Sequence, residues 1–335
     1  MRTRLRALDA RLLWVLLALM ALGTLTLYSA GRHTPQAGIW LKQGLWNLLG
    51  LVALAAVLVA GKRIGGATRW FVFAGQTFQP SELMKWVTLL YVATRLGTRS
   101  AESVNRWELL GLAGLVAFPM LLVLKQPDLG MALSFLPILL LIPLVKGLQW
   151  RWVFLLAVAV SVGGVFGWKL VLKPYQKQRV MIFLDPSRDL QGKGYQVNQS
   201  RIAIGAGGLI GKGFTSGSQT QLNFLPVKTT DFAFSVYAEE HGFLGVVLAL
   251  GLFGLLLSRL LDAAAQARTS AEAYFCAGAA AIFGMHLMVN VGMVAGALPN
   301  KGMVLPFFSA GGSSTLSFFL ALGLVMGVLH RSKVK

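Results

Sequence analysis

Nine long apolar blocks, separated by shorter polar segments, dominate the chain. Each block holds about 17 to 25 residues, the length that an α-helix needs to cross a hydrocarbon core roughly 30 Å thick. The pattern therefore predicts an all-α polytopic membrane protein with a single transmembrane domain over residues 1–335. The blocks are residues 12–31, 40–61, 81–97, 107–124, 128–146, 150–172, 236–258, 271–295 and 312–330.

Composition and charge agree with this prediction. Of 335 residues, 56% are hydrophobic and 13% are charged, and this charged share is about half of that in a soluble domain. The 31 Lys and Arg residues outnumber the 12 Asp and Glu residues, which alone would suit a nucleic-acid-binding protein. The cations gather at the ends of apolar blocks, however, as in residues 2–11 and 331–335. That distribution is the positive-inside pattern of a membrane protein.

The basic loops predict the topology. Loops at 95–106, 146–151 and 259–268 carry Lys or Arg, which places them in the cytoplasm together with both termini. Segments 62–80, 173–235 and 296–311 then face the outside. Nine spans cannot join two cytoplasmic ends, so either residues 62–80 re-enter the membrane or one span is missing within 45–65. We favour the missing span, because 40–61 reads as the start of one helix joined to the end of another.

The longest polar segment, residues 173–235, is predicted to be a large extracytoplasmic loop within the single domain. A loop of this length is uncommon and usually functional. It contains five glycines between 205 and 213, and eight Lys and Arg residues against three Asp. Its basic character indicates an anionic partner at the outer face.

Asp231 is the candidate catalytic carboxylate. It ends the long loop, in the run Lys228-Thr229-Thr230-Asp231-Phe232, just before an apolar helix. Asp is a good helix N-cap, and a carboxylate at the membrane boundary could also take a proton from a substrate hydroxyl. The two interpretations are compatible.

A second candidate lies in Gln79-Pro80-Ser81-Glu82, followed by Lys85. Pro80 favours a helix start, and residues three apart share a helix face. Charges inside a span are costly in lipid, so Glu82 and Lys85 should face the bundle interior. A structural ion pair and a functional pair remain equal alternatives.

Two further segments combine prolines with polar residues. Lys125-Gln126-Pro127-Asp128 is another proline-led helix start, and Asp128 could simply cap it. Residues 298–314 include two prolines, three glycines, and the candidates Lys301, Ser309 and Ser313. Irregular backbone at membrane depth is tolerated only where it is buried in protein or lines a cavity. Serine hydroxyls and helix-start N–H groups there could hold phosphate oxygens.

Other polar residues predict structure rather than chemistry. His286 and Asn290 lie four apart on one apolar helix, and we expect a buried polar contact between helices rather than a ligand site. The single Cys276 excludes an intrachain disulfide and a cysteine metal site. Glycines 205–213 lack the Walker spacing, so we reject a nucleotide loop.

Taken together, these segments resemble the SEDS family (shape, elongation, division and sporulation proteins), most closely its RodA branch. Any one motif is weak, but six in the same order over nearly the whole chain are specific. The motifs are Gly66-Ala67-Thr68-Arg69-Trp70, Gln79-Pro80-Ser81-Glu82, Lys125 to Gly130, Val197 to Gly208 with Gly217-Ser218-Gln219, Thr230-Asp231-Phe232 with Glu239-Glu240, and Gly311-Gly312-Ser313-Ser314.

The resemblance implies a ten-span helical bundle in the bacterial inner membrane, with both ends cytoplasmic and the active site on the outer face. It also implies a peptidoglycan glycosyltransferase that polymerises lipid II for cell-wall elongation and rod shape. The implied partner is a class B penicillin-binding protein, a transpeptidase. The chain departs from the family pattern at Val227, at Ala310, and in the helix-length missing before Arg69.

The family's loop aspartate maps onto Asp231, which the resemblance implies as general base in an inverting displacement of a lipid diphosphate. Fixed cations, or a divalent metal such as Mg or Mn, would stabilise the leaving group; no other cofactor is implied. The candidate cations are Arg69, Lys85, Lys125, Lys228 and Lys301, with Glu82 orienting Lys85. Other candidates for substrate binding are Gln79, Asp128, Gln199, Glu239, Ser309 and Ser313.

Two alternatives from other classes remain. A flippase or transporter of the lipid-linked precursor would need functional carboxylates near the bilayer midplane, whereas here they crowd the outer boundary. A non-catalytic scaffold for a penicillin-binding protein would have little reason to place Glu82 and Lys85 inside a span.

Overall fold

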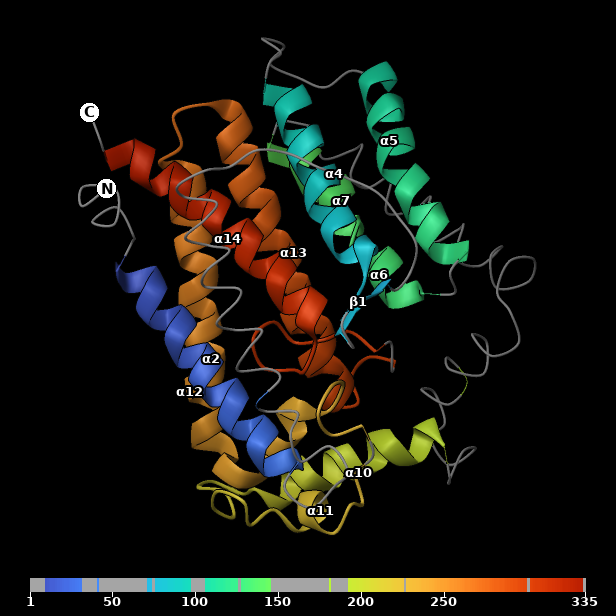
Figure 1. Ribbon diagram of the computed structural model, residues 1–335, viewed down its shortest axis with the longest axis vertical. Helices are drawn as coiled ribbons and strands as arrows, with labels where there is room; N and C mark the ends of the chain where they lie inside the picture. Colours follow the sequence, from blue (N-terminus) through green and yellow to red (C-terminus); the bar gives the residue numbers. More distant parts are fainter. Residues whose placement is uncertain are drawn as a thin grey trace.

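The computed structural model describes residues 10–31, 41, 71–73, 76–97, 106–125, 128–145, 181, 192–225, 227–299 and 302–333. This part of the chain is a bundle of helices with one short hairpin and a helical layer across one end (Figure 1). The longer helices are α2 (Ala10–Gly31), α4 (Pro80–Gly97), α5 (Arg106–Lys125), α10 (Lys193–Ala206), α12 (Ala233–Ala265), α13 (Ser270–Val294) and α14 (Gly312–Lys333). The shorter ones are α6 (Leu129–Leu133), α7 (Leu136–Val145) and α11 (Ser218–Gln221).

Five predicted spans coincide with α2, α4, α5, α13 and α14. Within the described ranges, three helices are long and apolar enough to cross a membrane: Ala233–Ala265, Ser270–Val294 and Gly312–Ser332. Blocks 40–61 and 150–172 lie outside the described residues, apart from residue 41. The proposed missing span falls in the same gap, so the count of ten spans stays a prediction.

The structure departs from the predicted pattern in three places. An antiparallel hairpin of β1 (Phe71–Phe73) and β2 (Gln76–Phe78), with Val72 opposite Thr77, precedes α4 and corrects the all-α expectation. Block 128–146 divides into α6 and α7 at a turn. The loop predicted at 173–235 contains α10 and α11. The turn between α6 and α7 lies at Ser134 and Phe135 within an apolar run, so the apolar pattern alone does not locate it.

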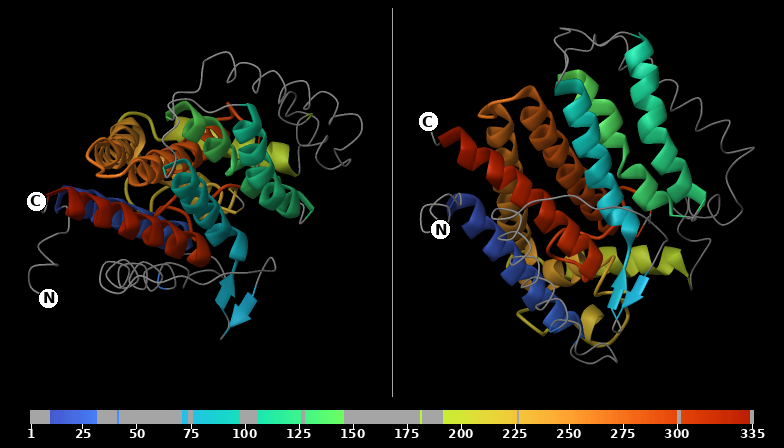
Figure 2. Two further views of the ribbon diagram at one scale, coloured as in Figure 1. Left: turned by 90° about the horizontal axis from the view of Figure 1, so that it is seen from above. Right: turned by 45° about the horizontal axis from the view of Figure 1, so that its top comes forward.

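One end of the bundle gathers the predicted cytoplasmic connections. A side chain on Gly97, at the end of α4, would collide with the backbone of Ala271 at the start of α13. Arg331, near the end of α14, forms an ion pair with Glu272 at 2.7 Å. The ends of α4 and α14 therefore both contact the start of α13, and all three lie at the same end of the bundle (Figure 2).

The opposite end gathers the described parts of the three segments predicted to face outside. The backbone N–H of Gln79 donates to the Ser313 Oγ at 2.8 Å. The Ser200 hydroxyl on α10 donates to the carbonyl oxygen of Val294 at 2.6 Å. The N–H of Ala310 also donates to the carbonyl of Thr229 at 2.9 Å. The described residues of 62–80, 173–235 and 296–311 therefore lie at one end of the helices.

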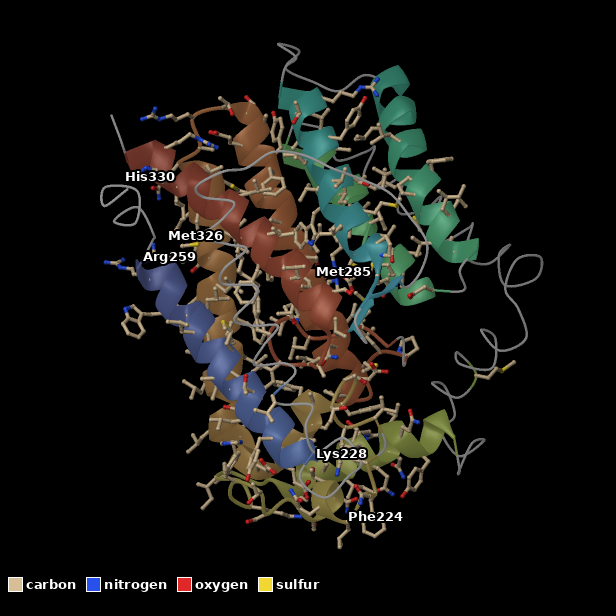
Figure 3. All side chains as sticks on the ribbon, in the orientation of Figure 1. Phe224, Lys228, Arg259, Met285, Met326 and His330 are labelled. Carbon is tan, nitrogen blue, oxygen red and sulfur yellow. The ribbon has the colours of Figure 1, made fainter. Side chains whose placement is uncertain are left out.

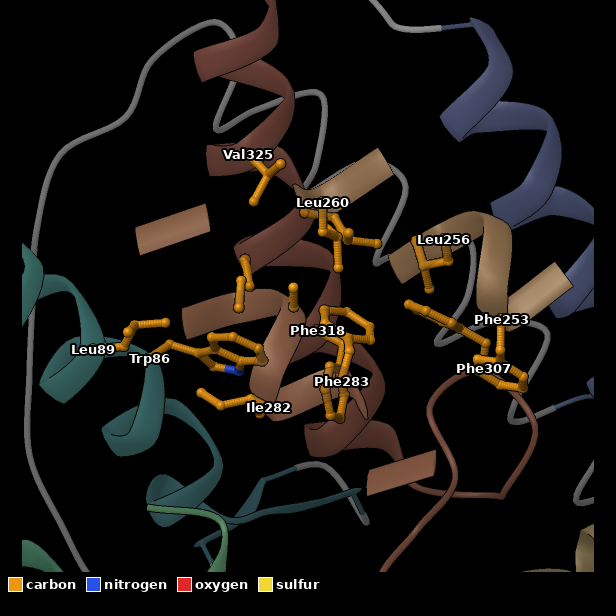
Figure 4. Packing of buried hydrophobic residues seen from close by; sticks show 14 of the residues in the cluster. Trp86, Leu89, Phe253, Leu256, Leu260, Ile282, Phe283, Phe307, Phe318 and Val325 are labelled. Carbon is orange, nitrogen blue, oxygen red and sulfur yellow. The ribbon is translucent and has the colours of Figure 1, made fainter. Parts of the chain in front are cut away.

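An aromatic cluster fills the seam between α4, α13 and α14. The ring centroids of Trp86 and Phe318 lie 5.4 Å apart, and those of Phe283 and Phe318 lie 4.6 Å apart (Figure 4). Phe307, from the segment before α14, stacks on Phe283 at 6.0 Å. Such aromatic pairs add stabilisation beyond the apolar area that they bury, so this seam fixes how the irregular segment 302–311 sits on the helices.

Helix α12 is interrupted at Gly242, whose φ of 64° and ψ of −162° are not helical. The glycine-rich segment 207–213 inserts at this break. Its N–H groups at Lys212 and Gly213 donate to the carbonyls of Glu239 and Glu240, each at 3.0 Å. In return, the N–H groups of residues 243 and 244 donate to the carbonyls of residues 208 and 209. The backbone groups that the break frees are thus satisfied by another segment, as a buried helix end requires.

The close backbone contact explains the glycines of this segment. Gly211 has a φ of 84°, and a side chain there would collide with the carbonyl of Glu240. We expect Gly211→Ala to lower the free energy of unfolding by about 1–3 kcal/mol, since it adds both overpacking and backbone strain. The thermal midpoint of the detergent-purified protein measures this. Gly205→Ala is the matched control, since its side chain would meet nothing within 4 Å; equal midpoints for the two variants would refute the packing explanation.

Candidate active site

Asp231 lies in the turn before α12, at the end of the bundle that holds the three segments predicted to face outside. The N-cap of α12 is Phe232, so the interpretation of Asp231 as the N-cap is not what the structure shows. The backbone carbonyl of Asp231 accepts a hydrogen bond from Asn290 Nδ2 at 3.2 Å. Its carboxylate lies over Gly302, where an added Cβ would be 3.3 Å from Asp231 Oδ2. Gly302 also has a φ of 63°, which glycine adopts without steric cost. The absence of a side chain at Gly302 also allows the close approach of the Asp231 carboxylate.

Two polar side chains of α13 hold the segment that faces Asp231. Asn290 Nδ2 donates to the carbonyl of Met303 at 2.7 Å, in addition to its bond to Asp231. His286 Nδ1 lies 3.0 Å from the carbonyl oxygen of Val304. Both side chains are buried, which confirms the predicted buried polar contacts. Asn290 therefore ties the loop that carries Asp231 to the irregular segment beside it.

His286 extends this network to the predicted ion pair. Lys85 Nζ lies 2.6 Å from Glu82 Oε2 and 3.4 Å from His286 Nε2. A carbonyl can only accept, so His286 Nδ1 carries the proton toward Val304, and Nε2 is left to accept from Lys85. Lys85 is fully buried, with its ammonium 4.4 Å from the ring centroid of Phe318. The predicted shared face and interior orientation of Glu82 and Lys85 are confirmed.

Gln79 connects the start of α4 to two other helix starts. Its backbone N–H donates to Ser313 Oγ, as noted above, and its Nε2 donates to Asp128 Oδ2 at 3.3 Å. Asp128 caps α6, because its Oδ1 accepts from the N–H of Met131 at 3.0 Å. The predicted cap is confirmed, and three candidates from distant parts of the sequence are in contact.

The segment between α13 and α14 is irregular, as predicted, and its polar groups are bonded from within the protein. Ser309 Oγ accepts from the N–H of Leu305 at 3.0 Å, and the N–H of Ala310 donates to the carbonyl of Thr229 at 2.9 Å. Phe307 has a φ of 65°, which is uncommon for a bulky residue. Ser309 therefore supports the backbone shape here, and its role in substrate binding stays a prediction.

Glu239 organises a second cluster, inside the helical layer. Its Oε1 accepts from Gln219 N at 2.9 Å and from Lys212 Nζ at 3.1 Å. Its Oε2 accepts from the N–H and the hydroxyl of Thr220 at 3.2 and 2.9 Å. The carboxylate is fully buried, and Gly217 leaves room for it, because a Cβ there would lie 2.6 Å from Oε2. Glu239 thus fixes the chain around α11 to α12.

Lys228 joins the same cluster (Figure 3). Its Nζ donates to the carbonyl of Thr220 at 2.6 Å and to Asn223 Oδ1 at 2.8 Å. Burial lowers the pKa of Lys228, and the charge of Glu240 opposes that shift. In this structure Lys228 and Glu239 stabilise the loop, and their predicted contacts with substrate remain untested.

For the other predicted candidates, the structure gives a position on a helix or no description. Gln199 lies half-buried on α10, and Lys125 is the last residue of α5. Arg69 and Lys301 lie outside the described residues. Among the described residues, no group of three or more His, Cys, Asp or Glu side chains could hold a metal ion. The expected divalent cation therefore stays a prediction.

Ser200 is a structural link that the sequence analysis passed over. It is fully buried on α10, and its hydroxyl lies 2.7 Å from the hydroxyl of Ser235 on α12 as well as bonding Val294. Ser200 therefore fastens the helical layer to two long helices. Ser200 follows the predicted candidate Gln199 directly in the motif Val197 to Gly208.

Two of the three departures from the family pattern lie near Asp231. Val227 is exposed and has a φ of 54°, a strained conformation for a β-branched residue, and its carbonyl accepts from the N–H of Thr230. Ala310, in the segment before α14, donates its backbone N–H to the carbonyl of Thr229. Val227 therefore belongs to the turn that carries Asp231, and Ala310 bonds that turn from another segment.

A family model described as cell cycle protein, and named for FtsW, RodA and SpoVE, matches residues 7–334. The chain belongs to the FtsW/RodA/SpoVE family. The family relatives include a probable peptidoglycan glycosyltransferase FtsW from Thiomicrospira cyclica, 40% identical over 94% of this chain and 81% of that protein. The peptidoglycan glycosyltransferase MrdB of Escherichia coli K12 is 40% identical over 84% of this chain and 76% of its own length.

Solved structures of the family have the same fold. A chain of a peptidoglycan synthase complex that coordinates polymerization and crosslinking aligns with a TM-score of 0.75 at 37% identity, over 98% of this chain and 99% of that chain. The rod shape determining protein RodA of Thermus thermophilus aligns with a TM-score of 0.66 at 31% identity, over 98% of both chains. This FtsW/RodA/SpoVE chain is therefore a multi-pass helical membrane bundle.

Glu239 accepts hydrogen bonds from Lys212, Ser218, Gln219 and Thr220, and these bonds generate a prediction about local stability. We expect Glu239→Gln to raise amide hydrogen exchange strongly at residues 217–222, because an amide oxygen cannot accept all the bonds of a buried carboxylate. Asp262→Asn is the control, since its pair with Arg259 is partly exposed. Unchanged protection at 217–222 in the Glu239 variant would contradict the structural role.

The buried pair generates a second prediction. Lys85→Met should destabilise the protein by about 3–5 kcal/mol, because it leaves Glu82 as an uncompensated buried charge. The double variant Glu82→Gln/Lys85→Met should recover most of that loss. Thermal midpoints in detergent measure both. If the double variant were as unstable as Lys85→Met alone, the stabilising role of Lys85 would not be to compensate the charge of Glu82.

Proposed function

We propose that this chain is a peptidoglycan glycosyltransferase of the inner membrane, which polymerises lipid II with Asp231 as the general base. The relatives named above support the activity. The observation that carries the proposal is the position of Asp231. Its carboxylate lies over Gly302, and its backbone carbonyl accepts a hydrogen bond from Asn290. At the same end of the bundle, His286 contacts the buried ion pair of Lys85 and Glu82.

The proposed reaction transfers one proton to Asp231 and releases one leaving group, the lipid diphosphate. Asp231 takes the proton from the acceptor sugar hydroxyl, whose oxygen attacks the anomeric carbon of the donor sugar. The bond from that carbon to the lipid diphosphate breaks as the new glycosidic bond forms, which inverts the anomeric centre. The lipid diphosphate departs with the bonding electrons, so no covalent sugar–enzyme intermediate is needed.

The leaving diphosphate gains negative charge, and fixed cations near it would stabilise the transition state. Lys85 is the described cation in the bonded network that leads toward Asp231, with Glu82 holding its ammonium. Arg69, Lys125, Lys228 and Lys301, or a bound Mg or Mn ion, complete the proposed positive environment. Gln79, Asp128, Gln199, Glu239, Ser309 and Ser313 are proposed to bind or to shape the sites for the sugars.

The proposed topology rests on the basic loops of the sequence, whose described residues lie at one end of the bundle (Figure 1). We place both termini in the cytoplasm and Asp231 on the outer face, in a ten-span domain with 173–235 as its large outer segment. The similarity to a chain of a peptidoglycan synthase complex supports a class B penicillin-binding protein as the partner, which would crosslink the strands that this chain polymerises.

The role of Asp231 is tested by its isosteric variant. Removal of a general base usually costs about 10²–10⁴-fold in rate, so Asp231→Asn should lower lipid II polymerisation by that factor and leave the thermal midpoint unchanged. Asp262→Asn is the control, because Asp262 lies at the opposite end of α12 and pairs with Arg259. The readout is the rate of glycan synthesis from labelled lipid II by the purified proteins. A near wild-type rate for Asp231→Asn would remove Asp231 from the mechanism.

A further inference from the structure

The starts of α4 and α14 face each other along one seam. Gln79, just before α4, bonds Ser313 in the first turn of α14. Six residues further along α4, the ammonium of Lys85 contacts the ring of Phe318 on α14. The two contacts advance in the same direction along both helices, so α4 and α14 run parallel, with their N-termini together at the Asp231 end (Figure 1).

Ser81 and Ser314 lie between these two contacts, Ser81 on α4 and Ser314 on α14. Ser81 is four residues before Lys85, and Ser314 is four residues before Phe318. Residues four apart share a helix face, so both hydroxyls belong to the seam. Ser81 is 6% exposed and Ser314 is 7% exposed. Neither hydroxyl has a hydrogen-bond partner among the residues that the structure describes.

Buried hydroxyls normally have partners, and two of them at paired helix starts indicate a ligand that accepts hydrogen bonds. The first turn of a helix presents N–H groups that have no acceptor within the helix, and it carries about half a positive charge. Two parallel helix starts add these effects. Glu82 would repel an anion, but its carboxylate is already bound by Lys85. The seam therefore favours an oxyanion, and phosphate is the common biological example.

We propose that the paired starts of α4 and α14 bind phosphate oxygens of the lipid diphosphate, with the Ser81 and Ser314 hydroxyls as donors. This inference rests on the proposed function, since it assigns the leaving group of that reaction to one place. It puts the diphosphate one helical turn from the Lys85 ammonium and next to the segment that faces Asp231. Ser81 and Ser314 are then binding residues for the donor.

Direct binding to the full-length protein tests the site without catalysis. The probe is farnesyl diphosphate, titrated into purified protein in neutral-lipid nanodiscs. A hydrogen bond to a charged oxygen is worth about tenfold in affinity, so Ser81→Ala and Ser314→Ala should each weaken binding about tenfold. Ser81→Thr keeps a hydroxyl and should bind nearly as wild type. Ser317→Ala is the control, because this buried hydroxyl donates to the carbonyl of Ser314 within α14.

The binding assay distinguishes failure of the proposed phosphate site from failure of the proposed role of Asp231. Asp231→Asn should bind farnesyl diphosphate normally, so lost binding in the serine variants supports the site even if Asp231→Asn remains active. Wild-type affinity in folded Ser81→Ala/Ser314→Ala protein would overturn the site. Inorganic phosphate and phosphatidylglycerol are the comparison ligands. If phosphatidylglycerol displaces the probe at equal concentration, the seam holds a phospholipid headgroup and the assignment to the donor fails.

Discussion

The apolar interior of this bundle leaves no water for backbone groups that lose their helical partners, and the structure depends on how these groups are satisfied. Where α12 breaks at Gly242, the segment 207–213 supplies the missing donors and acceptors. Where the chain leaves α13 and becomes irregular, Asn290, His286 and Thr229 bond the backbone of residues 303, 304 and 310. The bonds at Gly242 and the bond from residue 310 to Thr229 join segments far apart in the sequence, so each interruption also fixes a loop.

The functional end of the molecule follows from the same constraint. Asp231 is held between the start of α12 and the irregular segment because Asn290 bonds both. The buried charge of Lys85 is compensated by Glu82 and linked to that segment through His286. A carboxylate, an ammonium and two helix starts are thereby linked through the same segment, and the Lys85 side chain in this network is fully buried. Groups with these charges can serve proton removal and stabilisation of a leaving diphosphate.

Local pattern predicted much of this fold, and long-range contacts account for the rest. The lengths of the apolar blocks located α2, α4, α5, α13 and α14, and the three-residue spacing of Glu82 and Lys85 predicted their pairing. The break at Gly242 was not predicted, because an apolar run looks the same whether its backbone bonds lie within the helix or reach another segment. The structural role of Glu239 could not be predicted from the sequence, since its donors at 212 and 218–220 come together only after folding. Asp231 was identified through the motif around it rather than from its geometry.

The central claim is that this chain itself forms glycosidic bonds at the Asp231 end of the bundle. The most direct test supplies fluorescent lipid II to proteoliposomes that contain the purified protein and no transpeptidase, and then separates the products by size. The proposal predicts a ladder of glycan strands. Transfer of intact lipid II between the two leaflets without any ladder would contradict it and favour a transporter. The absence of both the ladder and the transfer would also contradict it and favour a non-catalytic scaffold.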